Sequence, residues 1–305
     1  MNAVDDAAAV LGPVARRDVP LGPLTTYRVG GPAALFVEIT DDAVLRLVSG
    51  ACRASGLPVL VVGRGSNLLV SERGFSGIAI VLASVTERID IDATTVRATA
   101  AVSLPVLARQ TVAAGLTGLE WAVGVPGSVG GGVRMNAGGH GGDIAATLRR
   151  VRVFDVATGE DRQMVATDLH LAFRRSVLTD HEVVLEAEFE LVAGDRAKSE
   201  DELADIVRWR RENQPGGQNA GSVFVNPLPD SAGRIIDSLG LRGLRHGSAH
   251  VSEKHANFIQ SDDDGLADDV YALLVEVRRR VASVTGIVLR PELRLVGFPP
   301  LPAAA

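Results

Sequence analysis

The sequence has little cysteine, little lysine and no long apolar run. Its one cysteine, Cys52, excludes an intrachain disulfide or a thiolate cluster and is typical of a reducing compartment. No stretch approaches the roughly 18 apolar residues of a bilayer-spanning helix, and the N-terminus lacks the basic and apolar segments of a secretory signal. We therefore expect a cytoplasmic protein without membrane insertion.

Charge and composition set the broad class of the protein. Acidic residues outnumber basic ones, 37 to 31, and the net charge of −6 argues against the phosphate-neutralising surface that nucleic acids need. With 46% hydrophobic and 22% charged residues, the chain can bury a core and does not resemble a disordered protein. At roughly 150 residues per domain, its 305 residues suggest two units, or three small ones.

Hydrophobic periodicity and glycine positions predict an α+β chain. Residues 1–20 read as a loosely ordered lead that contains alanine and proline. A strand is predicted at residues 34–40 and a helix at 41–55 that ends at Gly56, followed by a buried strand. This βαβ unit leads directly into a glycine-rich loop, GRGSN, at residues 63–67.

The rest of the chain is predicted to alternate strands and helices. One helix begins at Ser103, and another begins at a capping box of Ser199 and Glu202 that follows a domain boundary at 193–198. The last long helix has apolar residues on one side and ends at Gly286. Strands are predicted at residues 77–82, 88–100, 151–156 and 182–191.

Common catalytic and binding motifs are missing. Neither lysine follows a glycine, so there is no Walker loop, and Leu68 occupies the position of the third glycine of a Rossmann fingerprint. Leu185 replaces the second histidine of a zinc-binding HExxH pattern, and no G-x-S-x-G elbow is present. Three histidines lie close in sequence, but without a cysteine partner we read them as loop residues and expect no metal site: His246, His250 and His255.

Two glycine-rich loops remain as candidate ligand sites. In residues 63–67, Gly65 permits close approach of the backbone, and Ser66 and Asn67 supply hydrogen bonds to a pyrophosphate; an ordinary tight turn explains the same residues equally well. The second segment, residues 124–142, contains so many glycines that we favour a tight loop lying against a ligand over a plain surface loop.

Seven segments in a fixed order resemble one enzyme family. They are TYRVGGPA (26–33), VVGRGSNLLV (61–70), GLEWAVGVPGSVGGGVRMNAG (118–138), FRRSV (173–177), NAGSVFVNP (219–227), KHANFI (254–259) and LRPELRLVG (289–297). Together they resemble the UDP-N-acetylenolpyruvylglucosamine reductases, also called UDP-N-acetylmuramate dehydrogenases, in the shorter type that lacks an extra tyrosine-bearing loop.

The resemblance implies a fold and a reaction. It implies an FAD-binding fold of the vanillyl-alcohol-oxidase type with two α+β subdomains, and a C-terminal α+β substrate-binding domain. The corresponding ranges are 21–78 joined by 296–305, then 79–195, then 196–295. NADPH would reduce non-covalently bound FAD, after which UDP-N-acetylglucosamine enolpyruvate would take hydride from flavin N5 at C3 and a proton at C2. Such enzymes act in cytoplasmic peptidoglycan precursor synthesis, and we expect a monomer.

Three residues match the family's catalytic positions. Arg174 can meet the substrate carboxylate with two hydrogen bonds, although a solvated arginine pair is the plain alternative. Ser222 matches the proton donor to C2, and on sequence alone would be an ordinary turn residue. Glu292 matches a carboxyl group near the reacting carbon that must hold a proton, and otherwise would pair with Arg290 or Arg294.

Further positions match cofactor and substrate contacts. Asn226 and Lys254 match substrate-binding positions. The FAD-binding set is Tyr27, Arg28, Gly63, Arg64, Gly65, Ser66, Asn67, Leu68, Pro126, Gly127, Ser128, Gly130, Gly131, Asn136, Ala137, Gly138 and Arg294. The chain departs from the family at Phe173, where tyrosine is usual, and at Arg134 and His140. A flavin-dependent oxidase of a sugar or hydroxy acid and a non-catalytic UDP-sugar-binding protein remain alternative functions.

Overall fold

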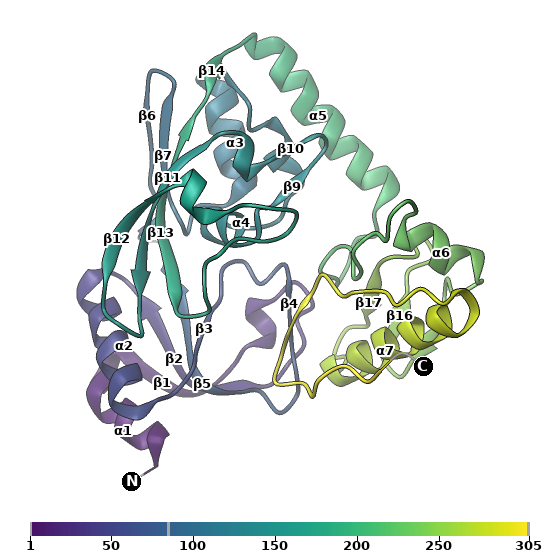
Figure 1. Ribbon diagram of the computed structural model, residues 1–305, viewed down its shortest axis with the longest axis horizontal. Helices are drawn as coiled ribbons and strands as arrows, with labels where there is room; N and C mark the ends of the chain where they lie inside the picture. The colour runs from purple at the N-terminus through teal and green to yellow at the C-terminus, as the bar shows by residue number, and fades with distance from the viewer. Residues whose placement is uncertain (1, 84–85, 304–305) are drawn as a thin grey trace. The chain divides into compact units, whose positions relative to one another are not determined.

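The computed structural model describes residues 2–83 and 86–303. The chain forms two compact units that interleave along the sequence. Unit 1 contains residues 1–17, 34–64 and 76–210, and unit 2 contains residues 18–33, 65–75 and 211–305. Figure 1 labels most helices and strands of both units. The mixture of helices with largely antiparallel sheets confirms the α+β class.

A four-stranded sheet forms the first half of unit 1. Its order is β1-β2-β5-β3, with β3 and β5 parallel. Helices α1 and α2 contribute Leu11, Leu45 and Val48 to the core beside it. The elements are α1 (Ala3–Leu11), β1 (Ala15–Pro20), β2 (Pro32–Ile39), α2 (Asp42–Ser55), β3 (Val59–Val61) and β5 (Phe75–Leu82), with a short 3-10 helix at Gly12–Val14.

This half confirms one helix prediction and corrects another. Gly56 ends α2 in the left-handed conformation with φ +70°, as the sequence predicted, and the side chain of Asp41, which the sequence analysis did not single out, caps its start. The loosely ordered lead expected at residues 1–20 is wrong, because α1 and β1 occupy it. Buried Ala7 and Leu11 order this segment against the core, a tertiary effect that its alanine-rich pattern does not reveal.

A five-stranded antiparallel sheet forms the second half of unit 1. Its order is β12-β11-β13-β7-β6, and α3 and α4 pack together on one face (Figure 1). Its elements are β6 (Ile89–Asp92), β7 (Thr95–Thr99), α3 (Leu104–Ala113), α4 (Val129–Met135), β11 (Leu148–Asp155), β12 (Asp161–Val165) and β13 (Glu182–Glu190). Its shorter strands are β8 (Leu116–Thr117), β9 (Gly138–Gly139), β10 (Gly142–Asp143) and β14 (Val192–Ala193). Short 3-10 helices lie at Glu120–Gly124, Ile144–Ala146 and Ala166–Leu169.

Two expectations fail in this half. The glycine segment 124–142, expected to be a loop, contains α4, because the Ser128 hydroxyl accepts the Gly131 amide and nucleates a short helix. Helix α5 (Arg196–Asn213) begins before the expected capping box. Asp195 accepts the first amides of that helix, while the Ser199 hydroxyl donates to buried Glu120 at 2.7 Å.

Unit 2 has its own core around the longest helix. Helix α7 buries Val270, Leu273, Val277 and Val281 of its predicted apolar side, and Gly286 ends it with φ +72°, but Leu266, predicted on the same side, precedes the helix and is exposed. Its elements are Gly22–Leu24, β4 (Leu68–Val70), α6 (Ala232–Ser238), β15 (Arg245–His246), β16 (Ala249–Val251), β17 (Ile259–Ser261), α7 (Ala267–Thr285) and β18 (Arg294–Val296). Strands β4 and β18 pair in parallel, and β15, β16 and β17 form a three-stranded antiparallel sheet.

Candidate active site

Arg174 lies in a strained turn of unit 1. Ala172 and Arg175 exchange two backbone hydrogen bonds of 2.9 and 3.0 Å, which leaves Phe173 and Arg174 as the two turn residues. Arg174 has φ +53°, a left-handed conformation that costs a side-chain-bearing residue about 1 kcal/mol or more. Strain of this kind often accompanies function, so the backbone itself marks Arg174 as a candidate.

Hydrogen bonds hold this turn against the glycine segment. The Arg174 guanidinium donates to the carbonyl of Gly138 at 3.0 Å and lies over the Phe173 ring, 5.0 Å from its centre. The Ser176 hydroxyl donates to the carbonyl of Arg134 at 2.7 Å, and the Asn136 amide donates to that of Ala172 at 3.2 Å. Two segments about 40 residues apart in sequence are thus joined around Arg174.

The two glycine-rich loops also meet within unit 1. A Cβ atom on Gly63 would lie 2.6 Å from the Ser128 hydroxyl oxygen, so only glycine allows this approach. At the start of α4, the amides of Val129 and Gly130 donate to Val102 and Ala100. Gly130 also could not carry a Cβ, which would lie 2.8 Å from that of Ala100. These α4 amides are therefore committed to the protein, and part of the glycine content serves packing.

Ser222 and Glu292 lie on adjoining extended segments of unit 2. The Glu292 amide donates to the carbonyl of Val223 at 2.8 Å, and the Val225 amide donates to that of Arg290 at 2.9 Å. Phe224 faces Pro291 between these two bonds. Ser222 is therefore the direct neighbour of the residue that fixes the backbone of Glu292.

Asn67 ties the first glycine loop to the same segment of unit 2. Its side-chain amide donates to the carbonyl of Glu292 at 3.2 Å, and its own carbonyl accepts the amide of Arg294 at 3.0 Å. A Cβ on Gly65 would lie 2.1 Å from the carbonyl oxygen of Leu24, so backbone packing requires this glycine. The expected role of Gly65 in approaching a pyrophosphate is not needed to explain it.

Asn257 is a residue of this site that the sequence reasoning missed. Its side-chain oxygen accepts the Phe224 amide at 3.0 Å, and its side-chain amide donates to the Phe224 carbonyl at 2.8 Å. Its backbone carbonyl also accepts the Val223 amide at 2.8 Å. Asn257 is 3% exposed, and its side chain makes the two backbone hydrogen bonds with Phe224 that a neighbouring strand would otherwise make. The KHANFI segment was recognised, but nothing within it distinguishes this asparagine.

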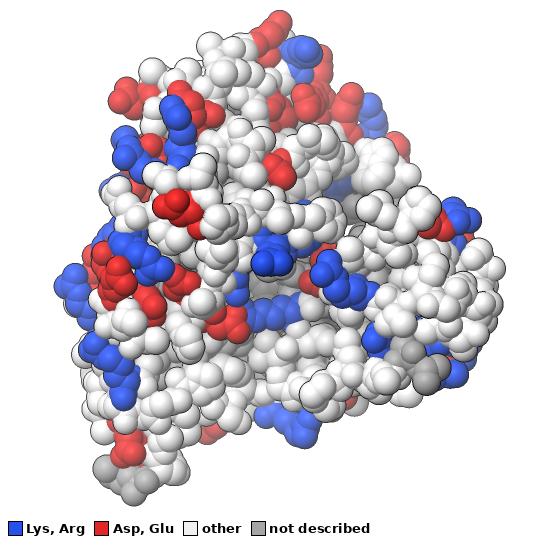
Figure 2. Space-filling view, in the orientation of Figure 1, with Lys and Arg blue, Asp and Glu red and all other residues white. Residues whose placement is uncertain are grey.

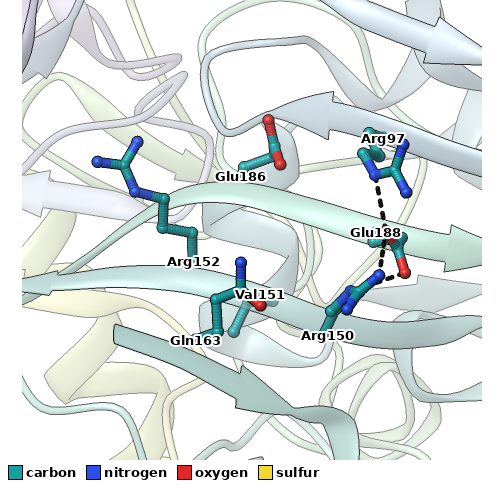
Figure 3. A pocket seen from close by; sticks show the side chains of 7 residues that line it. All are labelled: Arg97, Arg150, Val151, Arg152, Gln163, Glu186 and Glu188. Atoms are coloured by element: carbon teal, nitrogen blue, oxygen red, sulfur yellow. Dashed lines mark hydrogen bonds and ion pairs between the residues drawn. The ribbon is translucent and has the colours of Figure 1, made fainter. Parts of the chain in front are cut away.

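A polar hollow on the open face of the five-stranded sheet is a weaker candidate. Arg97 and Arg150 line it, and both donate to Glu188, at 2.7 and 2.8 Å (Figure 3). Burial alone would raise the pKa of Glu188, but these arginines hold it below its ordinary value. Acidic and basic side chains are also interspersed over the face of the molecule that Figure 2 shows. Arg97 and Arg150 are therefore already paired with an acidic side chain.

Comparison with known proteins identifies the family. Residues 213–296 match the UDP-N-acetylenolpyruvoylglucosamine reductase C-terminal domain, and residues 33–163 match an FAD binding domain. A UDP-N-acetylenolpyruvoylglucosamine reductase of Gloeobacter violaceus is 41% identical over 92% of this chain and 95% of its own. The chain belongs to the UDP-N-acetylenolpyruvoylglucosamine reductase family. It is an oxidoreductase with FAD as its cofactor.

Other relatives agree with this assignment. The reductase of Rubrobacter xylanophilus is 38% identical and covers 95% of this chain and 97% of its own. The crystal structure of the Thermus caldophilus reductase (MurB) superposes with a TM-score of 0.81 at 34% identity, covering 92% of this chain and 99% of that one. The predicted fold, an FAD-binding part followed by a C-terminal domain of this reductase family, is confirmed.

The first glycine loop of this reductase family member fits a dinucleotide cofactor. Within the described residues, the backbone N–H groups of Gly65, Ser66 and Asn67 donate to no protein acceptor. Successive free amides of this kind form an anion-binding concavity, which suits the phosphates of FAD without any lysine. The loop therefore keeps the donors that the cofactor needs.

Three of the residues expected at the FAD site differ in exposure and in protein contacts. Tyr27 is fully buried in the core of unit 2, and its hydroxyl donates to the carbonyl of Ile259, which argues against a flavin contact from its side chain. Burial raises its pKa well above the ordinary value. Arg28 is exposed with φ +56°, and Arg64 pairs with Glu87 at 3.5 Å.

The expected substrate-binding residues both have protein partners in unit 2. The Asn226 side-chain oxygen accepts the Ala232 amide at the start of α6, at 3.0 Å. The exposed Lys254 ammonium donates to the carbonyl of Arg211 at 2.5 Å. Among the described residues, no group of three potential ligands could hold a metal ion. No helix in residues 2–83 and 86–303 has the length and apolar character of a membrane span.

Proposed function

We propose that this protein reduces UDP-N-acetylglucosamine enolpyruvate to UDP-N-acetylmuramate, with NADPH as reductant, in cytoplasmic peptidoglycan precursor synthesis. The observation that carries the proposal is the strained turn that presents Arg174, together with the family membership. Seven other described non-glycine residues also have positive φ, so the conformation of Arg174 supports the proposal only in combination with the family membership.

Arg174 is proposed to bind and orient the substrate carboxylate. Hydride addition at C3 drives negative charge toward C2 and this carboxylate, and a fixed cation lowers the energy of that charge. The guanidinium is already directed by Gly138 and by the Phe173 ring, so less reorganisation accompanies the reaction. When bound, FAD supplies the hydride-transfer chemistry between NADPH and the enolpyruvyl C3.

Ser222 is proposed to deliver the proton to C2. A serine hydroxyl is a weak acid, so a second group must return its proton, and Glu292 is proposed to hold a proton near the reacting carbon for this purpose. The ladder between Val223 and Glu292 supports this pairing, because it fixes the two segments side by side in unit 2. Asn226 and Lys254 are proposed to contact the substrate.

The cofactor site is proposed to draw on both glycine-rich loops. The backbone amides of Gly65, Ser66 and Asn67 have no protein acceptor among the described residues, which favours these three as phosphate ligands. The side-chain donors of Asn136 are already bonded to protein groups and Tyr27 is fully buried, so we propose no side-chain contact with FAD from either. We propose that FAD binds non-covalently and that residues 21–78 with 296–305, and 79–195, form the FAD-binding subdomains. Residues 196–295 would form the substrate-binding domain, and the protein would act as a monomer.

Anaerobic spectroscopy tests this function directly. The purified protein should be yellow, bleach on addition of NADPH, and regain its colour when UDP-N-acetylglucosamine enolpyruvate is added. Acid denaturation should release the flavin into the supernatant. In D₂O, one deuterium should appear at C2 of the product in a single configuration.

Two outcomes would reject the proposal. Colour that returns only with oxygen, after reduction by a sugar rather than by NADPH, would identify an oxidase. A colourless protein that binds the UDP-sugar and cannot be loaded with FAD would identify a binding protein. Flavin that stays with the precipitated chain would contradict non-covalent binding and make His140, in the glycine segment, the first residue to test.

A further inference from the structure

Both side-chain N–H donors of Asn136, at the end of α4, have protein acceptors. Asn136 is 4% exposed and adopts the left-handed conformation, with φ 41° and ψ 58°. Its oxygen accepts the Ala145 amide at 3.0 Å, and its amide group donates at 3.2 Å to Asp143 and at 3.2 Å to the carbonyl of Ala172. An asparagine amide has only two N–H donors, so neither is left for a cofactor.

These bonds end at the turn that carries Arg174. Ala172 is the first residue of that turn, and its carbonyl also accepts the Arg175 amide that closes it. Two residues beyond Asn136, the carbonyl of Gly138 accepts the Arg174 guanidinium. Asn136 therefore fixes the base of the turn and lies beside the group that directs its side chain.

A strained turn needs such anchors. With φ +53°, Arg174 would gain free energy by relaxing to an ordinary conformation if the ends of the turn could move. A displacement of about 1 Å at a substrate-orienting group can cost about 10²-fold in rate. The hydrogen bond from Asn136 to Ala172 opposes that movement without touching the substrate.

We propose that Asn136 is a positioning residue for Arg174 rather than an FAD ligand. The proposal rests on the proposed function for its kinetic consequence, but its structural part concerns only the turn of residues 172–175. It revises the expectation from sequence, which placed Asn136 among the cofactor-binding residues.

A reciprocal exchange isolates the bond to Ala172. In the double variant Asn136→Asp, Asp143→Asn, the bond between positions 136 and 143 persists with donor and acceptor reversed. The oxygen that accepts the Ala145 amide also persists. Only the donor to Ala172 is lost, and a carboxylate oxygen replaces it. The parent protein is the matched comparison, because it shares both of these bonds with the double variant, whereas Asp143→Asn alone sets one amide donor against another and breaks the bond to Asn136.

Hydrogen exchange followed by mass spectrometry reads the turn without any substrate. The amides of Ala172 and Arg175 should exchange about tenfold faster in the double variant than in the parent protein, because their closed turn opens more often. Asn136→Gly, which removes the same donor and accepts the left-handed conformation of this position, serves if the double variant does not fold. Unchanged exchange in the folded variant would overturn the proposal.

A mutant cycle with Arg174→Ala separates positioning from cofactor binding. In the double variant, reoxidation of the flavin by the enolpyruvyl sugar should be about 10- to 100-fold slower than in the parent. Its affinity for FAD and the rate of flavin reduction by NADPH should stay within about twofold of the parent values. In the Arg174→Ala background it should add less than about twofold, because a positioning residue acts only through its target. Weaker FAD binding in both backgrounds would overturn the proposal in favour of a cofactor ligand. If the parent protein did not turn over the sugar, the proposed function would fail while the exchange result still decided the role of Asn136.

Discussion

The two segments proposed to carry the reaction are held in opposite ways. In unit 1, Arg174 lies in a left-handed turn that side-chain hydrogen bonds tie down from Asn136 and Ser176. In unit 2, Ser222 precedes an extended segment that a backbone ladder pairs with residues 290–292. The Arg174 turn has a strained backbone held by a few side-chain hydrogen bonds. The segment after Ser222 has an extended backbone held by a series of backbone hydrogen bonds.

The difference predicts what a substitution does in each segment. A ladder of backbone bonds does not depend on the side chain of Ser222, so changing that residue should alter chemistry and leave the geometry intact. The turn depends on its anchors and on the conformation of Arg174 itself, so changes there should affect both geometry and chemistry.

The largest effect is expected from Ser222→Ala. Loss of the proton donor should slow reoxidation by the sugar on the order of 10²- to 10⁴-fold, while reduction by NADPH stays near the parent rate. Glu292→Gln should slow the same half-reaction, because an amide cannot hold the exchangeable proton. Stopped-flow absorbance of the flavin measures each half-reaction. Parental turnover with a single C2 configuration would make Ser222 a turn residue.

Asn257→Leu should cause the largest loss of stability. It leaves the buried N–H and C=O groups of Phe224 without partners, at about 1–3 kcal/mol each. Urea unfolding should show a lower midpoint, whereas Glu253→Gln, four residues away and exposed, should change it little. A small effect from Asn257→Leu would mean that the ladder alone holds the segment beside Ser222.

Arg174→Lys should have the next largest kinetic effect. Lysine keeps the charge but loses the two-point geometry that matches a carboxylate, so we expect a loss of about 10- to 100-fold in reoxidation by the sugar. Reduction by NADPH should be nearly unchanged, which single-turnover traces of the two half-reactions can show. An equal loss of rate in both half-reactions would mean that Arg174 supports the fold or contacts the cofactor rather than the substrate carboxylate.

The sequence predicted best what short-range chemistry determines. Helix α2 ends at Gly56 and buries Leu45, Val48 and Ala51 on one side, as the pattern predicts, although Leu47, predicted on the same side, is exposed. Helix α5 shows the limit of such reasoning. Ser199 and Glu202 have the spacing of a capping box, but Asp195 caps the helix, because Ser199 is engaged by the distant Glu120.

The candidate site was predicted in its motifs and not in its supporting contacts. Family resemblance pointed to Arg174, Ser222 and Glu292, and their roles stay predictions. Asn257 was missed because its partner Phe224 lies 33 residues away, a relation that no local pattern contains. Asn136 was found as part of a motif and given a cofactor role. The hydrogen bonds from its two side-chain N–H groups to Asp143 and Ala172 are visible only in the three-dimensional structure.

Replacing Arg174 by glycine or alanine tests the strain directly. Both variants lose the side chain, but glycine accepts a positive φ, so Arg174→Gly should be more stable than Arg174→Ala by about 1 kcal/mol. Ser222 has an ordinary φ, so there the order should reverse, with Ser222→Ala more stable than Ser222→Gly by about 0.4–1 kcal/mol. Thermal unfolding of the four variants measures both signs. The same order at both positions would remove the distinction between the segments.

The smallest effect concerns acid stability in unit 2, away from both segments. Hydrogen bonds from Arg279 and Arg280 lower the pKa of Glu276 on α7 from 4.5 to about 2. Because the folded-state pKa lies below the unfolded one, this contribution is complete above pH 4.5 and disappears as the pH falls through about 2. The three side chains are partly exposed, so Glu276→Gln should cost less than about 1 kcal/mol at pH 7. Urea unfolding at pH 7, 4 and 3 should show the gap between parent and variant closing, with both half-reactions unchanged at pH 7. A difference in stability that widened with acid would contradict the stabilising role of these ion pairs. A slower half-reaction would mean that the exposed side of α7 affects the segment beside Ser222.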